Sequence, residues 1–302
     1  MSAKIGFIGL GTMGMPMAKN LLKLGHPMMV FDLVKEKTDE MKNLGAIVAE
    51  NNAQIAEECD VIFVSLLMPK IVQTVIAEKD GLIDHGHKGQ CIIDTSTISY
   101  GQSVALSELA AEKGILYMDL PISGGAGRAA DGTLSLMAGA SESEITAAGL
   151  TEYFNAIGSK IHYAGKRGGG VGLKILNNML SKAIMFADGE AVMMAEHMGI
   201  PFDTLYDVIS TSSSQNEILR IKKEHIKNHE YSPSNKSYFP VTGTLKDLNL
   251  AKQLGEDLGV ASFNCNNVIQ WYRIAMNQGY AQKDSSSIVE LIREMQPVNS
   301  EK

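Results

Sequence analysis

The sequence predicts an α/β fold in two parts, a doubly wound, mostly parallel sheet followed by an all-helical domain. Three observations predict it. Short apolar runs of strand length alternate with helical patterns through the first half, these runs stop at about residue 163, and one unusually long helical pattern begins soon after. We therefore expect two domains, residues 1–163 and residues 164–302, joined by that long helix.

A short apolar run, a glycine-rich turn and a helical pattern open the chain. The turn consists of Gly9, Leu10, Gly11, Thr12, Met13 and Gly14. In this spacing Gly9 makes the tight turn, Gly11 lets a pyrophosphate approach backbone N–H groups at the helix N-terminus, and Gly14 lets helix and strand pack closely. The order of elements predicts a Rossmann-type, dinucleotide-binding domain.

An acidic residue ends the expected second strand, which runs from Pro27 to Asp32. A carboxylate at this distance from the glycines accepts both hydroxyls of an adenosine ribose and repels a 2′-phosphate. Asp32 therefore favours NAD over NADP, and the neighbouring Leu33 offers no arginine for a phosphate. The alternative is an aspartate that only caps a helix or a turn.

The rest of the first half continues the alternation. The expected strands are Val61–Ser65, Cys91–Asp94, Ile115–Asp119 and Leu134–Ala138, and the expected helices are Lys35–Leu44, Ile71–Ile76 and Tyr100–Glu112. Ligands of parallel sheets gather beyond the carboxyl ends of the strands, which here are segments 66–68, 94–98 and 119–125. In the last segment Ser123, Gly124 and Gly125 offer a hydroxyl and two open N–H groups to a carboxylate, although an ordinary turn has the same residues.

The second half of the sequence contains helical patterns only. The expected helices are Lys174–His197, Phe202–Ser210, Glu217–Lys227, Thr244–Leu258, Asn264–Asn277 and Ser285–Glu294. The first follows a glycine cluster and places Lys174 and Asn178 one turn apart on one face, where both can bind one small polar molecule. A solvated lysine and a tolerated asparagine have the same spacing. Lys246 and Asp247 are a charged pair in an apolar helix, with a solvated or capping face as the alternative.

Composition excludes several classes of function. The 302 residues carry a net charge of −7, which argues against a nucleic-acid-binding or anionic-membrane surface. Cys59, Cys91 and Cys265 are in no metal-like spacing and fit buried thiols in a reducing compartment. The histidines form no metal-binding set, and His225 and His229 lie in a lysine-rich helical pattern that is typical of a surface.

Localisation and assembly follow from the same patterns. The sequence opens without a leader-like succession, and no apolar run approaches the ~18 residues of a membrane span. We therefore expect a soluble, cytoplasmic protein. A small helical domain beside a long apolar helix usually buries part of that helix in a partner, so we also expect a homodimer or a homotetramer.

Taken together, these motifs resemble the β-hydroxyacid dehydrogenase family over nearly the whole chain. The matching segments are residues 6–14, 94–97, 119–125, 168–178 and 246–251. The resemblance implies NAD as cofactor and hydride transfer between a small 3-hydroxy carboxylic acid and its semialdehyde or keto acid. Another short semialdehyde or a hydroxymethyl dicarboxylic acid is the alternative substrate within the same family.

The resemblance also implies roles for single residues. Lys174 is similar to the catalytic lysine, Asn178 to a substrate-orienting amide, Ser123, Gly124 and Gly125 to the substrate-carboxylate loop, Thr97 to a residue beside the nicotinamide, and Lys246 to one that closes over the cofactor. Leu66 and Leu67 also match cofactor-contacting positions. The family often has Leu-Pro-Asn where this chain has Leu-Leu-Met at 66–68, so an apolar methionine stands where the family has a polar asparagine.

Three other functions share this scaffold. Decarboxylating oxidation of a sugar-acid phosphate needs a longer chain and an arginine set that the second half lacks. Imine reduction usually dispenses with the lysine. A non-catalytic NAD-binding sensor would not need Ser123, Gly124, Lys174 and Asn178 together.

If Lys174 acts as a base near neutrality, its pKa must fall from about 10.4 through burial or a neighbouring cation.

Overall fold

The computed structural model describes residues 3–234 and 237–297. The chain forms two compact units, Met1–Lys174 and Ile175–Lys302. The division lies inside one long helix, α10 (Gly169–His197), whereas the boundary expected from the sequence, at 163/164, precedes this helix.

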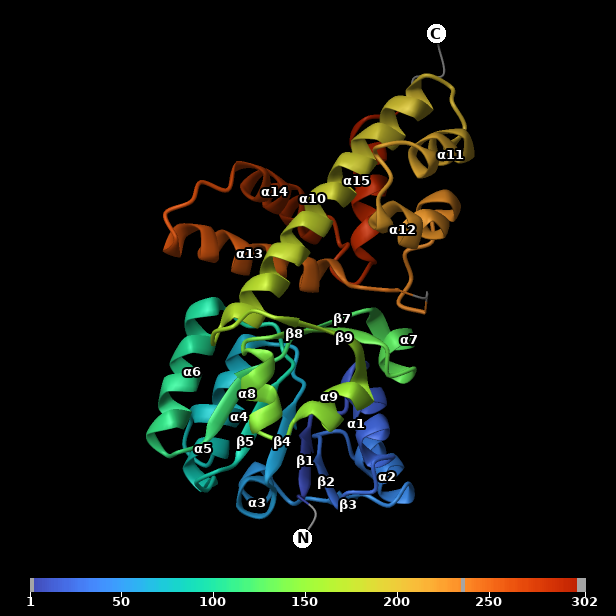
Figure 1. Cartoon of the computed structure of the whole chain (residues 1–302). Coiled ribbons are helices and arrows are strands. Elements are labelled where there is room, and N and C mark those ends of the chain that lie inside the picture. Colours follow the sequence, from blue (N-terminus) through green and yellow to red (C-terminus); the bar gives the residue numbers. More distant parts are fainter. Residues whose placement is uncertain (1–2, 235–236, 298–302) are drawn as a thin grey trace. The chain divides into compact units, whose positions relative to one another are not determined.

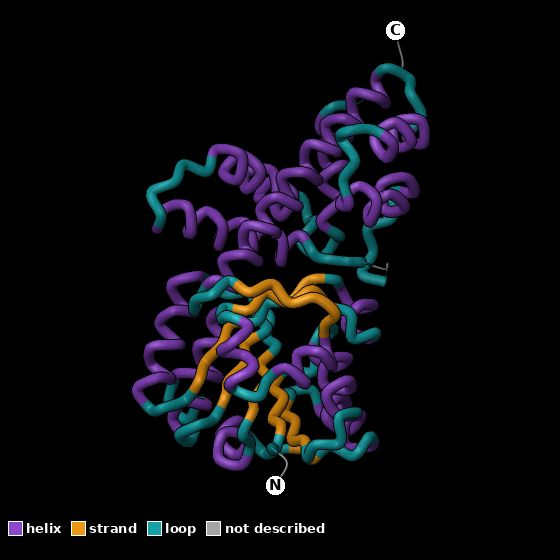
Figure 2. The backbone as a smooth tube through the Cα atoms, in the orientation of Figure 1, coloured by secondary structure: helices purple, strands orange, loops and turns teal. Residues whose placement is uncertain are grey.

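A six-stranded parallel sheet forms the centre of the first unit (Figure 2). Its strands are β1 (Ile5–Ile8), β2 (Met28–Phe31), β3 (Ile47–Val48), β4 (Val61–Val64), β5 (Cys91–Asp94) and β6 (Leu116–Asp119). The strand order is β3-β2-β1-β4-β5-β6, so the direction of winding reverses between β1 and β4. The side chains of β1, β4 and β5 are buried throughout, as expected for strands covered on both faces.

Helices flank this sheet (Figure 1). They are α1 (Gly14–Leu22), α2 (Lys35–Asn43), α3 (Asn52–Glu58), α4 (Pro69–Ala77), α5 (Leu82–His85), α6 (Tyr100–Glu112), α7 (Gly125–Ala130), α8 (Glu142–Ala147) and α9 (Thr151–Ile157). Helix α1 packs against α7 and α9, while α5 packs against α3 and α4. These contacts confirm the doubly wound architecture predicted from the alternating pattern.

A second, three-stranded sheet was not expected from the sequence. It contains β7 (Ile122–Ser123), β8 (Leu134–Ala138) and β9 (Gly158–Tyr163), in the order β7-β8-β9, with β7 antiparallel to β8 and β8 parallel to β9. The strand predicted at 134–138 therefore exists but does not join the main sheet. Because β9 is mostly exposed and β7 has only two residues, neither produces an apolar strand pattern.

The described part of the second unit is helical. After α10 come α11 (Phe202–Thr211), α12 (Glu217–Asn228), α13 (Val241–Asp257), α14 (Phe263–Asn277), the 3₁₀ helix η1 (Ser285–Ser287) and α15 (Ile288–Met295). The last predicted helix is thus 3₁₀ in its first turn. Among the described residues, no helix has both the length and the apolar character that crossing a membrane requires.

The prediction that His225 lies at the surface was wrong. Its side chain is buried, and its Nδ1 lies 3.3 Å from Oδ1 of the buried Asp284. Asp284 also accepts a hydrogen bond from the Phe239 N–H at 2.8 Å and pairs with the Lys222 Nζ at 2.7 Å. Two polar side chains of α12, those of Lys222 and His225, therefore lie in the interior because they bind this carboxylate.

Candidate active site

Four loops leave the main sheet at one edge. Ile8, Val64, Asp94 and Asp119 are in register across β1, β4, β5 and β6, and each is the last residue of its strand. The segments that follow, at 9–14, 65–68, 95–98 and 120–125, therefore emerge side by side. This edge includes the winding reversal between β1 and β4, where ligands of doubly wound sheets bind.

The glycine loop at this edge leaves no room for side chains at two of its positions. A Cβ on Gly9, whose φ is +92°, would lie 2.3 Å from the Ser65 carbonyl oxygen, and one on Gly14 would lie 1.9 Å from the Gly9 carbonyl oxygen. Around Gly11, by contrast, the space is open. The tight turn, the close packing and the open approach are the three features that a pyrophosphate-binding loop needs, so these residues fit a dinucleotide.

Asp32 faces the glycine loop from the end of β2. Its Oδ2 accepts a hydrogen bond from the Leu10 N–H at 2.6 Å, and its Oδ1 accepts one from the Val34 N–H at 2.8 Å. Asp32 is half-buried, while Leu33 beside it is 91% exposed. Each carboxylate oxygen has a further lone pair, so the position fits the ribose-binding role as well as the turn-capping alternative.

The two middle loops are tied to each other. The Leu66 N–H donates to the Ser96 Oγ at 3.0 Å, and the Ser96 N–H donates to Oδ1 of the buried Asp94 at 2.9 Å. Burial raises the pKa of Asp94 to about 6. Thr97 is half-buried in this loop, and Leu67 is 67% exposed. The predicted cofactor positions 66, 67 and 97 thus lie on neighbouring loops.

Ser123, Gly124 and Gly125 lie where β7 ends and α7 begins. Gly124 has φ +139° and Gly125 has φ +73°, both in the region that favours glycine, and both residues are exposed. Nothing lies within 4 Å of a Cβ placed on Gly125. The glycine-containing segment that follows, Gly125–Ala130, forms α7.

The first turn of α10 is held against this edge by Asp119. Its Oδ1 accepts a hydrogen bond from the Gly168 N–H, and its Oδ2 accepts one from the Val171 N–H, each at 2.9 Å. A Cβ on Gly170 would lie 2.1 Å from the Met137 carbonyl oxygen. The glycine cluster therefore lets the helix start on the sheets, and it fixes the backbone of Lys174, one turn later, within the first unit.

Asn178 lies one turn further along α10, in the second unit. It is buried, and its Nδ2 donates to the Asp247 Oδ2 at 2.8 Å. The Lys246 Nζ lies 3.0 Å from the Asp247 Oδ1. Asp247 is itself buried, so the pair 246–247 on α13 is not the solvated face that was the alternative.

Sequence reasoning gave no role to Asp119 or Asp247, although both lie in segments that carry the resemblance. Asp119 binds backbone groups of α10, and Asp247 binds an amide of the same helix. A carboxylate that follows an apolar strand and precedes a glycine-containing loop was a usable signal for Asp119. For Asp247 the only sequence signal was its position beside Lys246.

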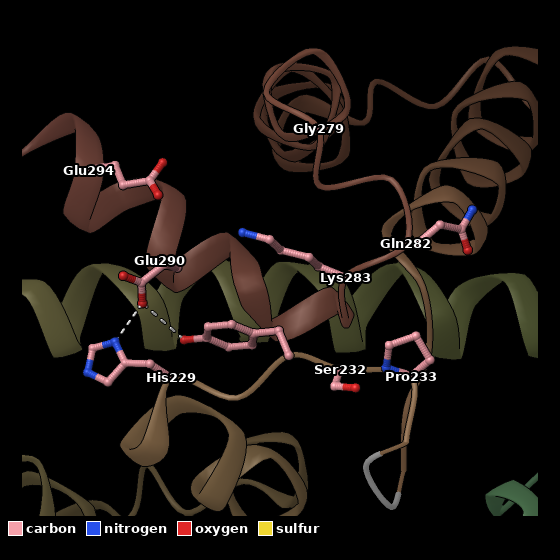
Figure 3. Close-up of a pocket in the computed structure, with 9 residues that line it drawn as sticks. His229, Ser232, Pro233, Gly279, Gln282, Lys283, Glu290 and Glu294 are labelled. Carbon is pink, nitrogen blue, oxygen red and sulfur yellow. Dashed lines mark hydrogen bonds and ion pairs between the residues drawn. The ribbon is translucent and has the colours of Figure 1, made fainter.

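One surface hollow, of about 550 Å³, lies in the second unit away from these residues (Figure 3). Glu290 in its wall is already engaged: its Oε2 lies 2.8 Å from the Nδ1 of His229, which also lines the hollow, and accepts a hydrogen bond from the Arg293 Nη1 at 2.8 Å. None of the predicted site residues lines it. In the described part of the chain, no cluster of His, Cys, Asp or Glu suits a metal ion.

Comparison with known proteins agrees with this geometry. Residues 4–165 match the NAD-binding domain of 6-phosphogluconate dehydrogenase, and residues 168–292 match the NAD-binding domain of NADP-dependent 3-hydroxyisobutyrate dehydrogenase. The chain is 33% identical to 2-(hydroxymethyl)glutarate dehydrogenase of Eubacterium barkeri over 299 residues, which is 99% of this chain and 97% of that one. The chain belongs to the β-hydroxyacid dehydrogenase family. The predicted family and fold class are thereby confirmed.

Other members of the β-hydroxyacid dehydrogenase family match over a similar length. The NAD-dependent L-serine dehydrogenase of Pseudomonas aeruginosa is 32% identical, over 95% of this chain and 97% of its own. The structure of 3-hydroxyisobutyrate dehydrogenase from Mycobacterium tuberculosis with L-serine has a TM-score of 0.85 and 27% identity, covering 97% of this chain and all of that one. The chain is thus a member of a family of NAD-dependent dehydrogenases that act on hydroxy acids.

Proposed function

We propose that this chain oxidises a small β-hydroxy acid to its semialdehyde or keto acid, and reduces it back, with Lys174 as the proton-transferring group. One observation carries this proposal. Asp119 and the glycines fix the start of α10, and so the Lys174 backbone, at the sheet edge from which the dinucleotide loop and the segment 123–125 also emerge. The named relatives act on hydroxy acids, which is the chemistry that a lysine beside a nicotinamide site suits.

Each residue of the proposed site has its own role in the reaction. NAD, when bound, supplies the hydride acceptor. Ser123 and the N–H groups of Gly124 and Gly125 bind the substrate carboxylate, while Lys174 takes the hydroxyl proton during oxidation. In reduction the Lys174 ammonium polarises the carbonyl and returns the proton. Asn178, whose amide nitrogen is held by Asp247, orients the substrate hydroxyl.

Replacing the lysine tests this assignment. Lys174→Ala is expected to lower kcat/KM by ~10²-fold or more, because proton transfer is lost, while NADH still binds. Lys160→Ala, at an exposed position on β9, is the matched control and is expected to retain full activity. For each variant, steady-state kinetics with a panel of 3-hydroxy acids measures kcat/KM, and fluorescence titration measures NADH binding. Near-normal turnover of Lys174→Ala would remove the lysine from the mechanism.

The choice of cofactor depends on Asp32. We expect a higher kcat/KM with NAD than with NADP, because the Asp32 carboxylate repels a 2′-phosphate. In Asp32→Ser the repelling charge is gone, so the ratio of kcat/KM with NAD to kcat/KM with NADP is expected to move closer to one. A wild-type preference for NADP would contradict the role of Asp32.

We also propose that the chain forms homodimers or larger homo-oligomers. Leu176, Leu180 and Ile184 follow one another at helical spacing on α10 and are 47%, 57% and 36% exposed. An apolar stripe of this kind is typical of a surface that a second copy covers. Light scattering measures the mass in solution, and a monodisperse monomer would rule the proposal out.

A further inference from the structure

Lys182 is a half-buried lysine on α10, in the second unit. Its Nζ lies 4.7 Å from the centre of the Phe239 ring. No residue that the structure describes makes an ion pair or a hydrogen bond with it. Burial lowers the pKa of Lys182, as expected for a cation that lacks a counter-ion at close range.

The nearby carboxylates are already engaged. Asp247 pairs with Lys246 through Oδ1 and accepts from Asn178 through Oδ2. Asp284 pairs with Lys222 and accepts hydrogen bonds from the Phe239 N–H and from Ser286.

The charges acting on Lys182 therefore do not balance. The strongest of them come from Asp247 and Asp284 and from Lys222 and Lys246, so the two negative charges are offset by two positive ones and leave the charge of Lys182 uncompensated. The Phe239 ring compensates it in part. An anion that approached Lys182 would restore the balance and would meet a donor that has no other acceptor among the described residues.

Lys182 also has a fixed relation to the proposed active-site residues. Lys174, Asn178 and Lys182 are spaced by four residues on α10, so they share one face and follow each other at about 6 Å along the axis. A substrate bound at Lys174 and Asn178 would therefore lie on the helix face that also carries Lys182.

We propose that Lys182 binds a second carboxylate, at the far end of the substrate, and that the preferred substrates are therefore small β-hydroxy dicarboxylic acids. This inference rests on the proposed function, because that function places the reacting end of the substrate at Lys174. The name of the Eubacterium barkeri relative gives one compound of this class, 2-(hydroxymethyl)glutarate.

Three substrates with the same reacting end isolate the effect of the distal charge. 2-(Hydroxymethyl)glutarate carries the second carboxylate, 2-(hydroxymethyl)pentanoate has a tail of the same length without a charge, and 3-hydroxyisobutyrate has a methyl group instead. The wild-type chain is expected to favour the dicarboxylate over the uncharged tail by about 10-fold or more in kcat/KM.

Lys182→Met tests the contact. It is expected to lower kcat/KM for the dicarboxylate by about 30-fold, mainly through KM, and to change the value for the other two substrates by less than about threefold. Lys182→Arg is expected to restore part of the loss. Lys223→Met is the matched control, because Lys223 also stacks on a ring, that of Tyr206 at 4.1 Å, and all three activities are expected to stay unchanged. An equal loss on all three substrates, or a wild-type preference for the uncharged tail, would overturn the proposal.

A binding measurement separates this inference from the proposed function. Calorimetry of the full chain with NAD compares 2-methylglutarate with 2-methylpentanoate, neither of which can react. If none of the three alcohols turns over but Lys182→Met abolishes a preference for 2-methylglutarate, the anion site stands and the proposed function fails. If the alcohols turn over without discrimination, the function stands and the anion site fails. No turnover and no preference would overturn both.

Discussion

The two units fix the geometry of their residues in different ways. In the first unit the geometry comes from the backbone: Gly9, Gly14 and Gly170 each lie where a Cβ would meet a carbonyl oxygen at 2.3 Å or less. In the second unit it comes from side-chain charges, such as Asp247 and Asp284, that bind groups far away in the sequence. Backbone geometry is encoded by neighbouring residues, whereas a charge network is encoded by residues that only the fold brings together.

The largest expected effect tests the charge network of the second unit. Asp284→Asn is expected to lower the free energy of unfolding by about 3–5 kcal/mol, because it leaves the buried Lys222 without its counter-ion. Denaturant unfolding followed by the fluorescence of Trp271, the single tryptophan of the chain, reports on this unit. Asp203→Asn, in an exposed pair with Lys227, is the control and is expected to leave the midpoint unchanged.

The effect of Asp284 depends on pH with a definite sign. Burial alone would raise its pKa, but the hydrogen bond from His225 and the charge of Lys222 hold the pKa well below the usual range. A carboxyl group with a depressed folded-state pKa stabilises the fold above its unfolded-state pKa and loses that contribution as the pH falls toward the folded-state value. The difference between wild type and Asp284→Asn is therefore expected to shrink below about pH 4. A difference that stays constant into acid would show that charge is not what Asp284 contributes.

Asp188 on α10 is expected to behave in the opposite way. It is buried and accepts one hydrogen bond, from the Asn216 Nδ2 at 3.0 Å, while its Oδ2 has no partner among the described residues. Burial raises the pKa of Asp188 from 3.8 to about 6. The folded state therefore holds its proton to a higher pH than the unfolded state does, and stability falls as the pH rises from about 4 to about 6.

Asp188→Asn removes this titration and keeps an acceptor for Asn216. Relative to wild type, its free energy of unfolding is expected to rise by about 3 kcal/mol between pH 4 and pH 7, which corresponds to a pKa shift of about two units. Glu190→Gln, at an exposed position on the same helix, is the control and should show no such trend. Parallel stability curves for wild type and Asp188→Asn would mean that Asp188 titrates normally.

The contrast between the units also explains what the sequence predicted. The strand, the glycine turn and Asp32 are close in sequence, and each has a local geometric reason, so the dinucleotide-binding half was predictable. The sheet of β7, β8 and β9 was missed because only β8 has an apolar pattern. His225 was placed at the surface because its partner, Asp284, lies on a segment that no local pattern connects to α12.

The smallest expected effect tests whether the backbone of the first unit is as restrictive as its glycines suggest. A Cβ on Gly170 would meet the Met137 carbonyl oxygen at 2.1 Å and the Gly139 nitrogen at 2.8 Å, and neither is a flexible side-chain end. Gly170→Ala is therefore expected to cost about 1–3 kcal/mol, measured as a lower thermal midpoint of the full chain. Gly172→Ala, two residues on, has only the Tyr100 Cδ2 at 3.8 Å and gains helix propensity, so it should be neutral or stabilising by up to about 1 kcal/mol. Equal effects of the two substitutions would mean that the start of α10 can move away from the sheets, and Asp119 alone would then have to position Lys174.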